Sequence, residues 1–209
     1  MAMKAYRCST LLFLAVLSLW GCTPSFLYIS DPTVYVREEL PPQETTSRLT
    51  VLPFDSPSYY PEIGMYTAKL FFQQLLEKKE FEVSFSQDTD WCEKGKSWTG
   101  KTELAVEEGR RLGSDYILIG SIDHYMIGHI TSSRVMVTAR LIEVRTGETM
   151  YFATVSGSGK PGKTFLLLDL KSGEHTPSAT SVLYAVVDTI VKDCFERKKG
   201  YLRPLNIIL

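Results

Sequence analysis

Residues 157–164 read GSGKPGKT and match G-x-x-x-x-G-K-[ST], the pattern of a phosphate-binding loop. In such a loop, backbone N–H groups and the N-terminus of a following helix hold the phosphates of a nucleotide. Lys163 would reach the outer phosphates, and Thr164 would bind Mg²⁺. Nucleotide binding is therefore the first function to test against the rest of the sequence.

The sequence after Thr164 does not favour a nucleotide site. Residues 165–171 allow at most two helical turns before Ser172 and Gly173, and the SGEHTP that begins there is typical of a loop. Only 45 residues follow Thr164, whereas a nucleotide hydrolase needs further βα units of roughly 30 residues each. We therefore expect a Gly- and Lys-rich hairpin end, with no nucleotide and no cofactor.

The other polar residues show no catalytic or metal-binding pattern. No pair of cysteines or histidines has zinc spacing, and no signature of a serine hydrolase or metalloprotease occurs. Asp123 and His124 are neighbours in an expected strand, where adjacent side chains point to opposite faces, so they are not expected to act together. Asp88 and Asp90 lie in a polar loop, where carboxylates are mostly solvated. The sequence predicts no catalytic residue, no metal site and no enzyme.

Four aromatic side chains in expected loops are candidates for contact with a partner. Exposed aromatic residues often anchor protein interfaces, because they bury a large area when they bind. The alternative is that these rings fold back over the edge of the core. The four candidates are Tyr59, Tyr60, Trp91 and Trp98.

The N-terminus has the pattern of a secretory signal. Lys4 and Arg7 form a short positive region before LLFLAVLSLW, residues 11–20, an apolar run too short to span a bilayer. The run is followed by Gly21 and Cys22. This pattern resembles the signal of bacterial lipoproteins, in which the cysteine is lipidated and becomes the first residue of the mature chain.

The lipoprotein resemblance implies a chain of three parts. Residues 1–21 would be the signal peptide, and acyl chains on Cys22 would anchor the protein, since stable anchoring takes more than one chain. Residues 22–47, with four prolines, would form an extended tether, and residues 48–209 a periplasmic domain. Thr23 stands where an Asp would retain a lipoprotein at the inner membrane, which implies the outer membrane.

Two cysteines, Cys92 and Cys194, remain after removal of the signal and lipidation of Cys22. In an oxidising periplasm they could form a disulfide. The alternative for Cys194 is a buried thiol, because this residue falls on the apolar stripe of an expected helix. Spacing along the chain does not decide between the two, since a disulfide depends on the distance between the residues in the fold.

Hydrophobic patterning predicts strands and helices that alternate and then a run of strands. From residue 48 onward the expected order is β-α-β-α-β-β-β-α, which predicts an α+β fold with helices packed on a single mixed β-sheet. Before it, FLYISDPTVYV is a candidate edge strand, and a phase shift in SRVMVTARLIEV predicts a β-bulge near residues 141–142. The expected helices are residues 61–79, 102–112 and 178–198.

Three stretches of the domain resemble a periplasmic domain of several envelope lipoproteins. They are RLTVLPFD at 48–55, EEGRRLGSDYILIGSIDHY at 107–125 and VTARLIEVRTGETMYFATVSGSG at 137–159. These stretches are similar to the CsgG-type curli secretion lipoproteins, to the LpoB-type lipoproteins and to the N-terminal domain of TolB. The resemblance implies their fold and no catalytic site, because these families act by assembling with other envelope proteins or touching them.

The resemblance implies an outer-membrane-anchored periplasmic lipoprotein that serves as an interaction or assembly factor, in regulation of cell-wall synthesis or in secretion. The alternative is an oligomeric subunit of a CsgG-type secretion channel, which inserts membrane-spanning hairpins into this domain. The loop at residues 87–101 is too short for two such strands of about 9–11 residues each. A formal charge of −1 gives no basic excess for nucleic acid. The expected partners are the membrane, through Cys22, and either another envelope protein or a second copy of this chain.

Overall fold

The computed structural model describes residues 26–36, 47–86, 102–128, 132–160, 162–166 and 169–196. The strands are β1 (Phe26–Ile29), β2 (Thr33–Val36), β3 (Arg48–Val51), β4 (Glu82–Phe85), β5 (Tyr116–Met126), β6 (Ser133–Glu143), β7 (Thr149–Lys160), β8 (Gly162–Leu166) and β9 (Asp169–His175). The helices are α2 (Ile63–Lys78), α4 (Thr102–Leu112) and α5 (Ala179–Glu196).

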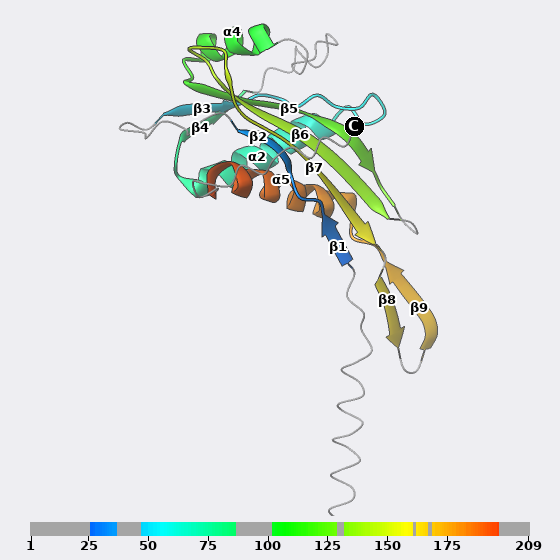
Figure 1. Ribbon diagram of the computed structural model, residues 1–209. Coiled ribbons are helices and arrows are strands. Elements are labelled where there is room, and N and C mark those ends of the chain that lie inside the picture. The colour runs from blue at the N-terminus through cyan, green and yellow to red at the C-terminus, as the bar shows by residue number, and fades with distance from the viewer. Residues whose placement is uncertain are drawn as a thin grey trace, which may run out of the picture.

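Seven strands form one mixed sheet in the order β1-β7-β6-β5-β3-β4, with β2 also paired to β7 (Figure 1). Strand β3 pairs in parallel with β4 and β5, as expected where helices connect successive strands. The β5, β6 and β7 strands form an antiparallel meander. The predicted α+β class is confirmed. The predicted order from residue 48 onward holds for the mixed sheet and its helices, and the separate β8–β9 hairpin is an unpredicted addition between β7 and α5.

The helices divide between the two faces of the sheet. Helices α2 and α5 cover one face, here called the inner face, and together with the strands they form the larger core cluster (Figure 1). Helix α4 lies on the opposite, outer face, where Ala105 and Val106 pack on Ile117, Ile119 and other residues in a second, smaller cluster. Alternating residues of β6 and β7 point into the inner core, which is why this meander reads as alternating apolar and polar residues.

Each predicted helix is present, and its ends follow local chemistry. Helix α4 ends at Gly113, whose φ of 68° is the left-handed conformation that glycine adopts readily at a helix end. Helix α2 ends at Lys79, which takes the same conformation with a φ of 57°. The tight turn between β6 and β7 contains Gly147, which takes a φ of 75°.

The predicted bulge is confirmed by a register shift between Leu141 and Ile142, where β6 pairs with β7. The candidate edge strand near the N-terminus is confirmed as two strands, β1 and β2, which both pair antiparallel with β7. The loop predicted for residues 172–177 is wrong as far as residue 175, because β8 and β9 pair as a hairpin and satisfy their backbone groups there.

Candidate functional site

Two of the predicted contact residues, Tyr59 and Tyr60, lie together beside the end of β5. The Tyr59 hydroxyl accepts a hydrogen bond from the backbone N–H of Tyr125 at 3.2 Å, and the Tyr60 ring lies 5.1 Å from the Tyr125 ring. Both side chains stay largely exposed, at 60% and 39%. The rings lean on the edge of the core and are also open to solvent, and their contact with a partner stays a prediction.

The remaining predicted site residues lie outside the described residues. They are Cys22, Trp91, Trp98 and Cys92, so lipidation and the Cys92–Cys194 disulfide stay predictions. Cys194 is partly buried on α5 against the larger core cluster, as its place on the apolar stripe predicted.

The residues of the phosphate-loop pattern do not have the geometry of such a loop. Gly157 lies within β7, and Lys163 and Thr164 lie within β8, so the pattern spans two strands and precedes no helix. The glycines have a packing role instead. A Cβ on Gly157 would lie 2.7 Å from Val186, and one on Gly159 would lie 2.8 Å from Pro177. A glycine is needed at these positions because α5 and the chain leading into it approach β7 so closely.

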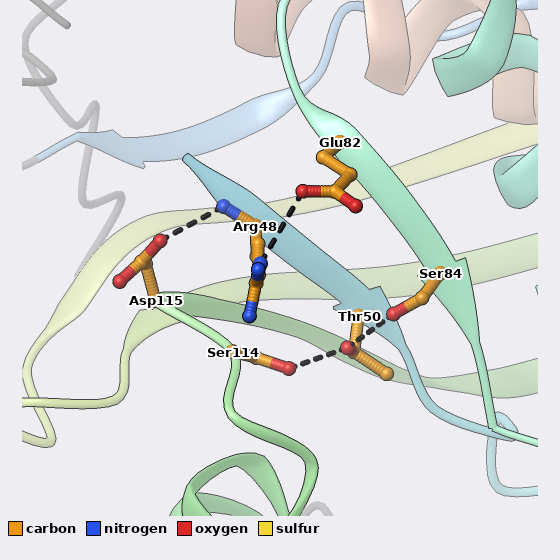
Figure 2. Close-up of polar contacts among 6 residues, drawn as sticks. All are labelled: Arg48, Thr50, Glu82, Ser84, Ser114 and Asp115. Carbon is orange, nitrogen blue, oxygen red and sulfur yellow. Dashed lines mark hydrogen bonds and ion pairs between the residues drawn. The ribbon is translucent and has the colours of Figure 1, made fainter. Parts of the chain in front are cut away.

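A pocket of about 330 Å³ lies where β5 begins, beside the end of α4. Asp115 accepts a hydrogen bond from the backbone N–H of Arg48 at 2.9 Å, and the Arg48 guanidinium lies 3.3 Å from Glu82 (Figure 2). The residues that line the pocket are Ser47, Arg110, Gly113, Ser114, Asp115, Tyr116, Glu143, Val144 and Arg145.

Behind this pocket, three hydroxyl groups form a chain across neighbouring elements. The Thr50 hydroxyl lies 2.6 Å from that of Ser84 and 2.5 Å from that of Ser114 (Figure 2). These contacts join β3 to β4 and to the turn before β5, and Thr50 and Ser114 are buried. Because the chain ends in hydroxyls and contains no base, it has the chemistry of a structural tie and lacks the nucleophile–base pair of a catalytic site.

The charges around the pocket do not favour a ligand of one sign. Two acidic residues, Asp115 and Glu143, and two arginines, Arg110 and Arg145, line it, and the Arg145 guanidinium lies 3.4 Å from the Glu143 carboxylate. Burial is the main cause that raises the pKa of the Tyr116 phenol above its ordinary value, and the charges of Glu143 and Asp115 act in the same direction. A phenol with a raised pKa stays protonated near neutral pH, so it can serve here as a hydrogen-bond donor and not as a base.

A second irregularity in the sheet lies on its outer face, where β5 has a bulge at Asp123. The pairing with β6 shifts between Ile122 and His124, so the alternation of side chains is interrupted there. Asp123 accepts hydrogen bonds from Ser121 at 2.7 Å and from Thr138 at 2.5 Å. Asp123 and His124 are both exposed on this face. The expectation that these two side chains point to opposite faces is therefore wrong.

The part of the outer face beyond α4 is not covered by any described helix. Its centre is polar, with the Thr138 and Thr154 hydroxyls 3.0 Å apart. Large apolar side chains flank this centre and are open to solvent, since Tyr35 is 53% exposed and Met136 is 37% exposed. The sequence did not single out these residues. The available signal was the FLYISDPTVYV segment itself, because an edge strand that adds to β7 extends this face.

Among the residues that the structure describes, no group of three metal-binding side chains comes together. Within the same part of the chain, no helix is long and apolar enough to cross a membrane.

No family model matches the sequence, and no curated protein matches it. Solved structures do share its fold. The PelC dodecamer from Paraburkholderia phytofirmans superposes with a TM-score of 0.52 at 15% identity and covers 84% of this chain and 100% of its own. At this level of identity, the likeness establishes the fold alone.

Two further solved structures are more distant. Lipoprotein GNA1162 from Neisseria meningitidis has a TM-score of 0.44 at 16% identity and covers 72% of this chain and 99% of its own. The LpoB C-terminal domain from Escherichia coli has a TM-score of 0.37 at 18% identity and covers 56% of this chain and 87% of its own. An LpoB-type domain thus recurs among the structural neighbours, while the resemblance to CsgG-type proteins and TolB stays a prediction.

Proposed function

We propose that this protein is an outer-membrane-anchored periplasmic lipoprotein that acts as a non-enzymatic interaction or assembly factor for another component of the cell envelope. Lipid on Cys22 holds it at the membrane, and the α+β domain presents the contact surface. The specific role is regulation of cell-wall synthesis or support of secretion, as in the families that the sequence resembles.

The observation that carries the proposal is the uncovered outer face of the sheet. A sheet face is normally either packed against other elements or lined by polar residues. Here Tyr35, Phe152 and Arg140 form one transverse row, as the strand registers show, and Tyr35 at the edge is more than half exposed. Phe152 lies between Tyr35 and Arg140, and the Arg140 guanidinium group donates a hydrogen bond to Thr102 of α4 at 3.0 Å. An exposed tyrosine beside a half-buried phenylalanine is typical of a protein-binding surface, where aromatic residues are enriched.

A second candidate is self-assembly into an oligomeric envelope complex, of which a CsgG-type secretion channel is one form. The observation that favours it is that PelC, which shares this fold across 84% of the present chain, is described as a dodecamer. In that case the outer face would pack against a second copy of the chain.

The two candidates separate in an in vivo crosslinking experiment. A photoreactive amino acid replaces Tyr35 on the outer face, and the matched control replaces Tyr184, which is 52% exposed on α5 at the opposite face. Each variant is produced in its native envelope, with Cys22 intact and with Cys22→Ala, and adducts are identified by mass spectrometry.

A discrete adduct with another envelope protein from position 35, absent from position 184 and lost with Cys22→Ala, would support the tethered interaction factor. A ladder of adducts between copies of the chain would favour the self-assembling candidate instead. Equal adducts from both positions, or none from position 35, would overturn the assignment of the outer face.

A further inference from the structure

Exposed apolar side chains gather at one end of the sheet. This aromatic end consists of Leu27, Tyr28, Tyr59, Tyr60, Met126 and Ile127, which are between 37% and 65% exposed. The strand registers bring them together. Tyr28 pairs with Ser158, Ser158 with Arg134, and Arg134 with Met126, so these residues form one row across four strands. Tyr59 and Tyr60 join this end through their contacts with Tyr125.

The aromatic end differs in chemistry from the opposite end of the sheet. Six of the twelve exposed large apolar residues in the described part of the chain belong to it, with the exposed cations Arg134 and Lys160 beside them. At the opposite end, where the pocket lies, the strand ends and turns carry charges of both signs. These charged residues are Arg48, Glu82, Asp115, Glu143, Arg145 and Glu148.

The pairing of β1 places the start of the mature chain at the aromatic end. Phe26 pairs with Lys160, the last residue of β7, and the two strands are antiparallel. The start of β1 therefore lies at the end of the sheet where β7 ends. Cys22 precedes Phe26 by four residues, so a lipid on it lies within roughly 14 Å of this end even if the connection is fully extended.

The β8–β9 hairpin projects from the same end (Figure 1). Its base is held in place, because the Ser133 hydroxyl donates a hydrogen bond to the Pro177 carbonyl at 2.9 Å and Pro177 packs over Gly159. Five residues of β8 extend for roughly 16 Å, about the reach of the lipidated Cys22. At the far end of the hairpin, Leu166 of β8 pairs with Asp169 of β9, and the two strands contribute Lys163 and Lys171.

We propose that the aromatic end and the β8–β9 hairpin are a second membrane contact, seated in the headgroup region of the membrane that holds the lipid of Cys22. Tyrosine favours this region because its ring is apolar and its hydroxyl is polar, and lysine and arginine reach phosphate groups from the same depth. Exposing an apolar surface of this kind to water is unfavourable. The membrane that holds the lipid of Cys22 can cover it, because Cys22 precedes Phe26, at this end of the sheet, by only four residues. The inference rests on the lipid anchor of the proposed function.

This contact assigns Tyr59 and Tyr60 to lipid and not to a protein partner. It also orients the domain. The aromatic end faces the membrane, the charged end with the pocket points away from it, and the outer face of the sheet stands open to the side. A partner in the periplasm then meets the outer face without competing with the membrane.

Quenching of tryptophan by lipid tests the contact. The intact lipoprotein, with Trp91→Phe and Trp98→Phe, receives one tryptophan at Tyr28 or, as the matched control, at Tyr35. The two tyrosines are exposed at 65% and 53% on strands that pair with β7, opposite Ser158 and Phe152, roughly 20 Å apart along that strand. Each variant is reconstituted into vesicles of phosphatidylethanolamine and phosphatidylglycerol that contain brominated phosphatidylcholine.

We expect strong quenching of Trp at position 28, and of a third reporter made by Phe165→Trp, with little quenching at position 35. Equal quenching at 28 and 35, or none at 28 in protein that floats with the vesicles, would overturn the contact. If position 28 instead crosslinks to another protein in cells, the aromatic end is a protein-binding surface and the proposal is wrong.

A second measurement avoids substitutions. The unaltered lipoprotein is bound to vesicles that contain a phosphatidylcholine with a photoreactive acyl chain, and the labelled peptides are mapped by mass spectrometry. Labels at residues 26–28 and 126–127 with none at 143–148 support the contact, and the reverse pattern refutes it. Failure of the anchor itself is distinguishable, because then no variant floats with vesicles and the mass of Cys22 shows no acyl chains.

Discussion

At the scale of single residues, Gly157 illustrates how a sequence motif can have a purely structural cause. A Cβ added there would lie 2.7 Å from Val186 Cγ2 and 2.8 Å from Val182 Cγ1, both on α5. Because overpacking of a core costs about 1–3 kcal/mol, we expect Gly157→Ala to lower the free energy of unfolding by that amount. Urea unfolding of the purified protein measures the effect.

The control for Gly157 is the neighbouring Ser158→Ala. Ser158 is half-buried and its side chain lies on the other face of β7, so the change should stay within about 0.5 kcal/mol. Equal unfolding midpoints for the two variants would show that α5 can shift to accommodate a Cβ at position 157, so that packing does not require glycine there.

The candidate site was harder to predict than the core, and Asp123 shows why. Strict alternation places Asp123 and His124 on opposite faces, but one extra residue in β5 puts both on the outer face. A signal was present, because two polar residues separate the buried residues Ile122 and Tyr125, a spacing that strict alternation does not allow. The sequence alone does not show that His124 pairs with Met136, so it does not show on which face of the sheet Asp123 and His124 lie.

At the scale of elements, helix α5 begins with a side-chain cap. The Ser178 hydroxyl accepts a hydrogen bond from the backbone N–H of Ser181 at 3.1 Å, which satisfies one of the free N–H groups of the first turn. We expect Ser178→Ala to lower the free energy of unfolding by about 1 kcal/mol and Ser178→Asp to preserve it, since Asp caps equally well. Guanidinium unfolding followed by circular dichroism compares the two. If both variants unfold at the same guanidinium concentration as the wild type, the cap does not stabilise α5.

The three helices could be predicted closely because their signals are local. Gly113 marks the end of α4, and the apolar stripe of α5 repeats at helical spacing. The β8–β9 hairpin could not be predicted in this way. Its strands contain glycine, lysine, serine and aspartate, which are rare in strands, so its structure depends on the pairing of β8 with β9 and not on local preference.

At the scale of the whole molecule, the mixed sheet follows from the order of its elements. Strands joined by a helix can pair in parallel, as β3 does with β4, and strands joined by a short turn pair antiparallel, as β5 does with β6. The place of β1 and β2 does not follow from this rule. They pair with β7, more than a hundred residues along the chain, and only that pairing shows which end of the domain lies near Cys22.

The position of β1 and β2 predicts that the stable domain begins before residue 48. Both strands cover the edge of β7, and Ile29 and Val34 pack on the larger core cluster. Full burial of such a side chain contributes about 1.5–3 kcal/mol, so two partly buried ones should together contribute roughly 2 kcal/mol. We therefore expect a chain of residues 48–209 to unfold at a lower urea concentration than one of residues 23–209.

A matched variant separates packing from chain length. The double variant Ile29→Ala, Val34→Ala in the chain of residues 23–209 keeps the strand pairing and removes only the apolar contacts. Its urea unfolding midpoint should therefore fall between the midpoints of the unaltered chains 48–209 and 23–209. If the chains of residues 48–209 and 23–209 instead unfold at the same urea concentration, β1 and β2 contribute nothing to stability. Residues 22–47 would then behave as the extended tether that the prolines predicted. The lipid would then no longer be held close to the aromatic end, because a loose segment of that length lets the domain turn freely at the membrane.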